Sequence, residues 1–298
     1  MRVFVTGATG YVGGFILQEL RRQHIKARCL VRTYDQAERI NADGTEAVIA
    51  DVTNPKTLEG VLTNCDAVIH LVAIIKEHQK NNITFERLNY ESTKNMVDIA
   101  LAQGVRRFLY MSALGADIHG ATAYLRSKGK AEGYVCDSGL NYTIFRPSFI
   151  FGPGDGVYTM LAKTIKKSPL GMIPHFGIRK YRHQPVSIYD VVRGFVNALE
   201  NEKTFYKKYD VGGPHPLSFR EQLKAVANAI DTKVRLIPLP LFLSRILVAM
   251  MAIFPSSPID SDRLKMLTRD NVCDPRPFAD DLCINLTSFR QGLAYLKK

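Results

Sequence analysis

Residues Thr6–Gly13, TGATGYVG, determine the fold of this 298-residue chain. They follow a short apolar run and open a stretch, Val12–Arg22, whose apolar residues have helical spacing. Gly7 permits a tight strand-to-helix turn, Gly10 lets a diphosphate approach the backbone, and Gly13 lets the helix pack closely on the sheet. The free N–H groups and the dipole at such a helix start stabilise phosphate. The stretch therefore predicts a dinucleotide-binding loop, which also contains Thr9, Tyr11 and Val12.

Short β-branched runs alternate with longer amphipathic stretches through residues 1–150. This alternation is typical of repeated βα units around a parallel sheet. The predicted strands are Val3–Val5, Ala27–Val31, Ala47–Ala50, Ala67–Leu71, Arg107–Met111 and Tyr142–Phe145. The predicted helices are Val12–Arg22, Pro55–Leu62, Phe85–Ala102 and Ala123–Asp137. We therefore expect an α/β fold with a doubly wound parallel (Rossmann) sheet.

The alternation ends after Pro147, where a Gly/Pro-rich turn, FGPGDG, follows. Beyond it the sequence predicts a strand near Tyr209–Val211 and a helix from Ser218 to about Ile230. Ser218 and Glu221 have the spacing of a capping box. We expect residues 1–150 to form an NAD(P)-binding Rossmann core and residues 151–298 a smaller C-terminal lobe, with Tyr209–Val211 returning to the sheet.

Charge and cysteine usage limit the classes of partner. The chain has 40 Lys and Arg against 28 Asp and Glu, a net charge of +12, of which residues 151–298 carry +9. The basic residues are interspersed with acids and form no recognised nucleic-acid module, so we expect no nucleic-acid partner. The five cysteines show no CxxC spacing and the seven histidines no HExxH spacing, which argues against a metal site or a disulfide framework. A reducing cytoplasm fits this pattern, and MRVFV before the first motif leaves no room for a cleavable signal peptide.

The most apolar stretch, Leu239–Phe254, is shorter than the roughly 20 residues of a spanning helix and contains Arg245. We expect it not to span a membrane. It is either a helix packed on the protein itself or a helix docked on a membrane surface or a partner protein. The predicted localisation is therefore cytoplasmic, with peripheral membrane association as the second alternative.

The end of the second predicted strand bears on the choice of cofactor. An NAD-preferring site usually has an acid there for the ribose 2′-hydroxyl. This chain has Arg32, whose guanidinium suits a 2′-phosphate, although Asp35 lies three residues later. The alternative is a solvated arginine at a strand end. Arg32 favours NADP(H) over NAD(H).

The TGxxGxxG spacing resembles that of the extended and atypical short-chain dehydrogenase/reductase superfamily, the NAD-dependent epimerase/dehydratase-like proteins. Asn89 with Thr93, and Asp190 with Val191, fall where that superfamily has further motifs. The resemblance implies an acid near the adenine, backbone lining the cofactor after the fourth strand, and a turn over the nicotinamide. The positions that match these roles are Asp51 and Val52, Leu71, Val72 and Ala73, and Arg146 and Pro147.

The resemblance also implies a catalytic Tyr-x-x-x-Lys pair, in which the lysine lowers the pKa of the phenol and holds the nicotinamide ribose. Two pairs have this spacing, Tyr90/Lys94 and Tyr124/Lys128. Tyr124 follows the fifth predicted strand and opens a helix, where the family has its pair, so Tyr124/Lys128 is the candidate. Ser112 is the candidate serine, but an alignment on the family's second serine gives that place to Ala113 and leaves dehydrogenase activity open.

Within this superfamily the chain is most similar to the NADPH-carrying accessory subunit of respiratory complex I and its bacterial relatives. The similarity lies in Tyr124–Lys128 (YLRSK), Gln184–Val186 (QPV) and Pro238–Phe242 (PLPLF). Two functions follow. The first is an NADP(H)-dependent oxidoreductase or epimerase that uses Tyr124/Lys128 on an unknown small substrate. The alternative is a non-catalytic NADPH-binding accessory or assembly subunit of a respiratory membrane complex.

Overall fold

The computed structural model describes residues 1–298 except 42–43, 169–170, 177–180, 240–264, 267 and 298. Its contacts divide the chain into two compact units. Unit 1 comprises Met1–Pro147, Ile188–Asp210 and Arg276–Ile284, and unit 2 comprises Ser148–Ser187, Val211–Pro275 and Asn285–Lys298. The chain therefore crosses between the units repeatedly, rather than once near residue 150. The predicted apolar helix Leu239–Phe254 lies almost wholly outside the described residues.

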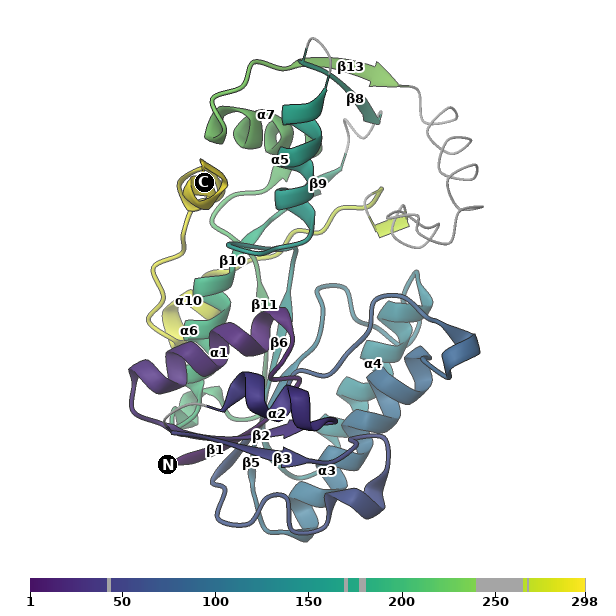
Figure 1. Cartoon of the computed structure of the whole chain (residues 1–298), viewed down its shortest axis with the longest axis vertical. Coiled ribbons are helices and arrows are strands. Elements are labelled where there is room, and N and C mark those ends of the chain that lie inside the picture. The colour runs from purple at the N-terminus through teal and green to yellow at the C-terminus, as the bar shows by residue number, and fades with distance from the viewer. Residues whose placement is uncertain (42–43, 169–170, 177–180, 240–264, 267, 298) are drawn as a thin grey trace. The chain divides into compact units, whose positions relative to one another are not determined.

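Unit 1 is built on a seven-stranded sheet with the order β11-β6-β5-β4-β1-β2-β3 (Figure 1). Neighbouring strands from β6 to β3 pair in parallel, and Val5 of β1 lies opposite Cys29 of β2 and Ile69 of β4. This order reverses direction at β1 and confirms the predicted doubly wound fold. The strands are β1 (Arg2–Thr6), β2 (Lys26–Val31), β3 (Thr45–Ile49), β4 (Ala67–His70), β5 (Arg107–Met111), β6 (Asn141–Pro147) and β11 (Lys207–Val211).

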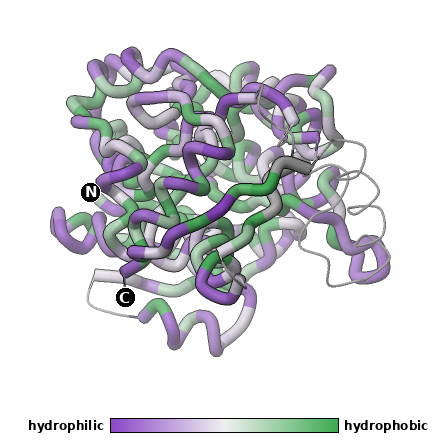
Figure 2. The backbone as a smooth tube through the Cα atoms, turned by 90° about the horizontal axis from the view of Figure 1, so that it is seen from above, coloured by the Kyte–Doolittle hydropathy of each residue, from purple (hydrophilic) through white to green (hydrophobic). Residues whose placement is uncertain are grey.

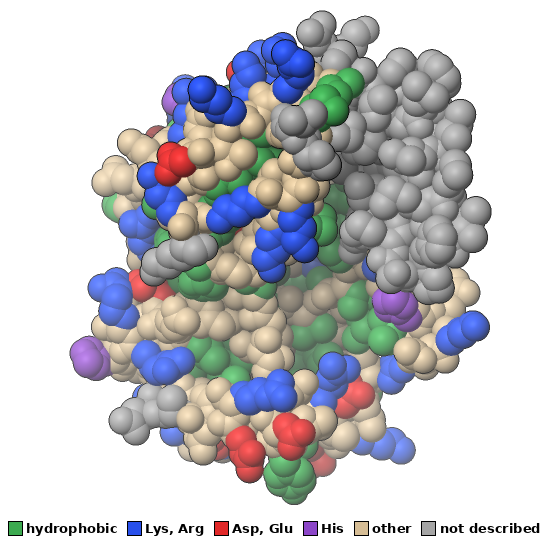
Figure 3. All heavy atoms as spheres, turned by 45° about the horizontal axis from the view of Figure 1, so that its top comes forward, with side chains coloured by type: hydrophobic (Ala, Val, Ile, Leu, Met, Phe, Trp, Pro, Cys, Tyr) green, Lys and Arg blue, Asp and Glu red, His purple; other side chains and the backbone are tan. Residues whose placement is uncertain are grey.

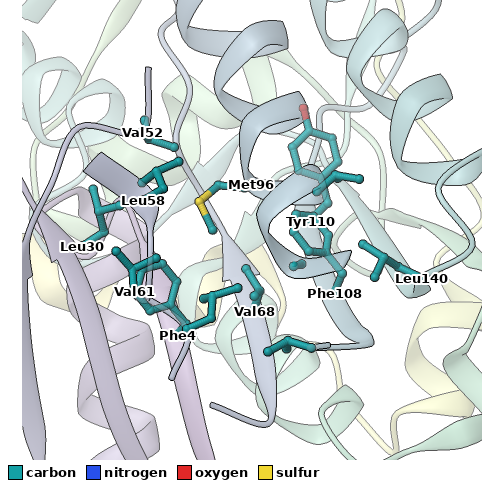
Figure 4. Packing of buried hydrophobic residues seen from close by; sticks show 14 of the residues in the cluster. Phe4, Leu30, Val52, Leu58, Val61, Val68, Met96, Phe108, Tyr110 and Leu140 are labelled. Carbon is teal, nitrogen blue, oxygen red and sulfur yellow. The ribbon is translucent and has the colours of Figure 1, made fainter. Parts of the chain in front are cut away.

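Helices pack in pairs around this sheet. Helices α1 (Tyr11–Arg22) and α6 (Ile188–Ala198) contact each other, as do α3 (Ser92–Ala102) and α4 (Ala123–Cys136). Alternate strand residues face α3 and α4, and Figure 4 shows Phe4, Val68 and Phe108 directed toward Met96 of α3. Successive strand residues point to opposite faces, so strands covered on both sides must be apolar throughout. Hydrophobic and hydrophilic stretches alternate along the chain accordingly (Figure 2).

The predicted elements agree with the structure where the hydrophobic pattern is long. The strand Arg107–Met111 has the predicted bounds, and Ser218 and Glu221 form the predicted capping box on α7 (Phe219–Ala229). The helix predicted over Pro55–Leu62 is wrong: only a 3-10 turn, Pro55–Leu58, forms. The helix predicted over Phe85–Ala102 begins as a π-helix, Glu86–Glu91, and continues as α3. Helix α2 (Tyr34–Ile40) was not predicted, because Ile40 is its only buried residue.

Arg107 joins the start of β5 to the end of α6. Its side chain is buried and donates to the carbonyl oxygens of Ala198 and Leu199 and to the Thr204 hydroxyl, among other acceptors. The ring of Phe205 lies 4.6 Å from the guanidinium. Burial lowers the pKa of Arg107 to about 10, which leaves it charged at neutral pH. The oxygens at the end of α6 carry partial negative charge, so they stabilise the Arg107 cation, for which the described part of the chain shows no carboxylate partner.

Residues from near the C-terminus complete unit 1. Helix α10 (Arg276–Asp281) inserts Phe278, which is fully buried, against α6. A Cβ atom at Gly194 would lie 2.4 Å from the Phe278 ring, so only glycine fits there. The rings of Phe145 and Tyr209 lie 6.1 and 6.4 Å from that of Phe278. The core of unit 1 therefore contains side chains from both ends of the sequence.

Among its described residues, unit 2 contains three two-stranded pairings, β7 (Ile150–Phe151) with β10 (Val186–Ser187), β9 (Arg182–His183) with β12 (Leu217–Ser218), and β8 (Met172–Phe176) with β13 (Arg235–Leu239). The helices in this part of the described chain include α5 (Val157–Lys167), α7, α11 (Phe289–Gly292) and a 3-10 turn, Leu293–Lys297. The buried Asp155 carboxylate accepts hydrogen bonds from the amides of Tyr158 and Thr159 and so caps α5. Two further short 3-10 turns, Gln79–Asn81 and Glu202–Thr204, both lie in unit 1.

Candidate functional site

The glycine-rich loop leaves no room for side chains at two of its positions. Gly7 has a φ of +73°, and the amide of Gly10 donates to the Gly7 carbonyl at 3.0 Å. A Cβ atom at Gly13 would lie 2.2 Å from that carbonyl oxygen and 2.7 Å from Ala8 Cα. These are backbone atoms and cannot turn away. The loop is thus a bare backbone turn at the start of α1, with Thr9 exposed and Val12 buried, which is the form that a diphosphate requires.

The end of β4 lies against this loop. A Cβ atom at Gly7 would lie 3.2 Å from the backbone of Leu71 and Val72. The segment beyond, through Ala73, is held by the buried side chain of Asn89, which accepts from the Ile74 amide at 2.8 Å and donates to Ser127 at 3.0 Å. The structure therefore brings the glycine loop, Leu71–Ala73 and α4 together at the carboxyl end of the sheet.

The side chains predicted to contact the adenosine end lie at the ends of β2 and β3. Arg32 is exposed, and its backbone amide donates to the Gln36 side chain at 2.9 Å, while its guanidinium has no hydrogen-bond partner among the residues that the structure describes. Asp51 accepts from the Thr53 amide and hydroxyl at 2.9 and 2.8 Å, and Val52 is buried. Arg32 thus leaves its guanidinium available, whereas Asp51 is partly used in a local turn.

Helix α4 carries the predicted reactive pair. Thr122 caps its start by accepting from the Leu125 amide, and the spacing of four residues puts Tyr124 and Lys128 on one helical face. Lys128 is fully buried and donates to the Met111 carbonyl at 2.7 Å. Burial lowers the pKa of Lys128 to about 7, against the opposing effect of Glu132. Burial raises the pKa of Tyr124 to about 12, so the phenol is not activated by these protein groups alone.

The other pair of the same spacing lies elsewhere. Lys94 forms an ion pair with Asp98 at 2.5 Å on the surface of α3. The ring of Tyr90 lies 3.8 Å from the Lys130 ammonium. Both side chains are therefore engaged with residues that take no part in the candidate site.

Ser112 is committed to a buried ionic group. Its hydroxyl donates to the carboxylate of Glu132, which is 2% exposed. The same carboxylate accepts from Arg146 Nε at 2.9 Å, and Arg146 also lies 3.7 Å from Asp210. The next residue, Ala113, has no hydroxyl. The hydroxyl of Ser112, the serine that the sequence predicted as catalytic, therefore donates its hydrogen bond to Glu132 rather than toward a substrate.

Sequence reasoning missed Glu132, although a signal was present. It lies four residues after Lys128, so it falls on the same helical face and toward β5 and β6. Arg146 and Pro147, at the end of β6, frame the other side of this network, and the Pro147 carbonyl accepts from the Leu114 amide at 3.0 Å. A buried carboxylate four residues from a buried lysine indicates an ionic network rather than a solvated face.

Ser112→Ala tests the role of this hydroxyl. We expect the free energy of unfolding to fall by about 1–3 kcal/mol, because one acceptor of Glu132 loses its donor. The nucleotide dissociation constant and any rate of hydride transfer should stay within about twofold of wild type. Isothermal calorimetry measures the dissociation constant, and single-turnover absorbance at the NADPH band measures the rate of hydride transfer. A tenfold loss of turnover at unchanged stability would assign the hydroxyl to catalysis.

Across the described ranges, no three His, Cys, Asp or Glu side chains are grouped to hold a metal ion. Within the same part of the chain, no helix has the length and apolarity needed to cross a membrane.

A family model described as NAD(P)H-binding matches residues 7–173, more than half of the chain. The protein therefore belongs to this NAD(P)H-binding family, among the epimerase/dehydratase-like short-chain dehydrogenases/reductases. A structure of UDP-glucose 4-epimerase from Thermus thermophilus in complex with NAD matches all of the chain and 98% of its own, with a TM-score of 0.76 and 19% identity, and so shares the fold.

Two curated relatives are named as a subunit and as an assembly factor of larger complexes. The mitochondrial NADH dehydrogenase (ubiquinone) 1 alpha subcomplex subunit 9 of Arabidopsis thaliana is 26% identical over 252 residues, 82% of this chain and 62% of that protein. The chain thus spans about three-fifths of the length of that complex I subunit. The photosystem II assembly factor Ycf39 of Synechocystis is 23% identical over 271 residues, 89% of this chain and 78% of that protein. The sequence-based resemblance to complex I accessory subunits is confirmed.

Proposed function

We propose that this protein binds NADP(H) and retains it as a structural ligand within a larger membrane-associated assembly, with little or no hydride transfer. The observation that carries the proposal is the commitment of Ser112 to Glu132, with Ala113 as its neighbour. A substrate oxygen would then lack the serine hydroxyl that usually orients it. The complex I subunit and Ycf39, both parts or assembly factors of membrane complexes by name, support the same role.

The residues that hold the nucleotide are those of the glycine loop and Lys128. Because Gly13 has no Cβ atom, the start of α1 can approach the glycine loop closely. This close approach leaves backbone amides of the loop free to donate to a diphosphate. Lys128 uses one N–H on Met111 and has two more to donate to ribose hydroxyls. The reduced nicotinamide would supply a hydride donor there, and in the proposed role the glycine loop and Lys128 would bind the nucleotide without presenting that donor to a substrate.

The preference for NADP(H) rests on Arg32. Its guanidinium is exposed at the end of β2, and a 2′-phosphate offers it a bidentate partner. We expect Arg32→Glu to weaken NADPH binding by about 10- to 100-fold and to leave NADH binding equal or better, because the carboxylate repels the phosphate and accepts from a 2′-hydroxyl.

The matched control is Arg39→Glu, which makes the same change of charge at an exposed position that lies on α2 rather than at the end of β2. Calorimetric titration of both variants with NADPH and NADH gives the ratio of affinities. An unchanged ratio in Arg32→Glu, or an equal change in Arg39→Glu, would remove the basis for the NADP(H) preference.

The partner is inferred from charge. Basic side chains are more frequent than acidic ones over the face that Figure 3 shows, and residues 151–298 carry +9 of the net +12. Such a surface favours contact with anionic lipid or an acidic protein partner, which suits a cytoplasmic protein lying peripherally at a membrane complex.

The test begins with protein purified without added nucleotide. Heat or acid releases the bound ligand, and mass spectrometry identifies and counts it. We expect close to one NADP(H) per chain that exchanges slowly and is not consumed when ketones and quinones are added. An empty site, or rapid oxidation of NADPH, would contradict the structural role.

A second function, an NADP(H)-dependent oxidoreductase, is favoured by the retention of Tyr124 and Lys128 on one face of α4. The UDP-glucose 4-epimerase of Vibrio cholerae (24% identical over 265 residues) and the ceramide reductase of Caulobacter vibrioides (30% over 169 residues) are enzymes by name. Turnover that disappears in Tyr124→Phe, with nucleotide binding intact, would establish this function in place of the first.

A further inference from the structure

The Lys128 ammonium lies against two consecutive residues of β5. Its Nζ lies 4.3 Å from the centroid of the Tyr110 ring and donates to the carbonyl of the next residue, Met111, at 2.7 Å. Lys128 and Tyr110 are both fully buried. An ammonium within about 6 Å of a ring face is attracted by the ring quadrupole, and the attraction is strongest where water is excluded.

The Tyr110 ring also packs against His70 of β4. It stacks on the His70 ring with the centroids 5.8 Å apart and the planes 17° apart. His70 Nδ1 lies 2.7 Å from the Thr6 hydroxyl and Nε2 lies 3.2 Å from the Thr93 hydroxyl, so both ring nitrogens are engaged. Burial, and to a smaller extent Lys128, lowers the pKa of His70 to about 3. A neutral, tethered imidazole therefore supports the tyrosine ring without adding a second positive charge.

We propose that Tyr110 is a positioning residue of the nucleotide site, whose ring face holds the Lys128 ammonium in its charged form and leaves two of its N–H groups for the nucleotide. This role rests on the nucleotide binding proposed above. Thr6 opens the glycine loop, so the column Thr6–His70–Tyr110–Lys128 connects that loop to the lysine through contacts that the structure records.

Few charged groups face the Lys128 ammonium among the described residues. On α4 the nearest acid is Glu132, which raises the pKa of Lys128, but its carboxylate is also shared by Arg146 and the Ser112 hydroxyl. Tyr124, on the same face of α4, and Tyr110, on β5, are protonated at neutral pH, since burial raises the pKa of both phenols. His70 on β4 is neutral. Burial has the largest effect on the pKa of Lys128 and lowers it. Glu132 and the Met111 carbonyl oppose this effect, and the Tyr110 ring face adds an attraction that does not depend on the ionisation of Tyr110.

The experiment measures NADPH affinity against pH for wild type, Tyr110→Phe and Tyr110→Leu. Phenylalanine keeps the ring face, so its pH profile should match wild type. Leucine removes the ring, so the pH at which affinity begins to fall should drop by about one unit, giving roughly tenfold weaker binding at pH 8 and little change at pH 6.

Phe108→Leu is the matched control. Phe108 lies two residues from Tyr110 on the same face of β5, as Figure 4 shows, and is also fully buried. Its loss should lower stability without moving the pH profile. If Tyr110→Leu does not fold, 3,4,5-trifluorophenylalanine at position 110 keeps the shape of the ring and removes most of its quadrupole, and should shift the profile in the same direction.

Carbon-13 NMR of the lysine Cε atoms in nucleotide-free protein provides a second readout, with the Lys128 signal assigned from its absence in Lys128→Met. Its titration midpoint should fall in the leucine or trifluorophenylalanine protein and stay fixed in Tyr110→Phe. An unmoved midpoint, or a loss of affinity equal at every pH and equal to that of Phe108→Leu, would overturn the proposal. A protein that shows the NMR shift but binds no nucleotide would instead contradict the proposed function alone.

Discussion

Gly13→Ala is expected to abolish useful nucleotide binding while the rest of the sheet still forms. The added methyl group would lie 2.2 Å from the Gly7 carbonyl oxygen, so the loop and the start of α1 must separate. Overpacking of this kind costs about 1–3 kcal/mol. The same displacement moves the loop amides away from the diphosphate, so the NADPH dissociation constant should rise about 100-fold or more. Fluorescence titration with NADPH and circular dichroism measure the two effects.

Gly14→Ala is the control for this change, because it adds the same methyl group one residue further along α1. A Cβ atom at Gly14 meets nothing within 4 Å. Alanine should raise the free energy of unfolding by about 0.5–1 kcal/mol through its helix propensity and leave affinity unchanged. Equal NADPH affinity in the two variants would show that the loop geometry does not control binding.

Arg107→Met should cause the largest loss of stability of any change considered. Methionine has similar length, but the carbonyls of Ala198 and Leu199 and the hydroxyl of Thr204 lose their buried donor. We expect the free energy of unfolding to fall by roughly 3–5 kcal/mol, measured by urea denaturation followed by far-ultraviolet circular dichroism.

Arg106→Met removes the neighbouring charge from an exposed position and serves as the control. It should change stability by less than about 0.5 kcal/mol. A loss below about 1 kcal/mol in Arg107→Met would mean that water replaces the guanidinium at the end of α6.

The sheet could be predicted because its strands are apolar on both faces and each is bounded by turn residues. Arg107–Met111 had its observed bounds, and Tyr209–Val211 proved to be part of β11. The short helix over Pro55–Leu62 failed because local apolar spacing over so few residues does not outweigh the turn propensity of Asn54 and Pro55. Helix α2 was not predicted because it has one buried residue, which gives no helical periodicity of apolar residues in the sequence.

The site was predictable in its backbone and less so in its electrostatics. The glycine loop could be predicted from the sequence, because its backbone conformation and close contacts are ones that few residues other than glycine allow. The engagement of Ser112 by Glu132 depends on contacts among α4, β5 and β6, and the stack of Tyr110 on His70 depends on the pairing of β4 with β5. Such partnerships are decided by register between distant segments, which one sequence does not encode in any local pattern.

The placement of Phe278 in the core of unit 1 also has a consequence for biosynthesis. A nascent chain that has emerged only as far as β6 lacks α6, β11 and the Phe278 ring that packs on Gly194. The part of the core that α6 and Phe278 cover then remains exposed until α10 has left the ribosome, although α1 is already present. The nucleotide loop is synthesised well before the residue that completes the core of its unit, so chaperone occupancy during translation is expected to persist at least until α10 has emerged.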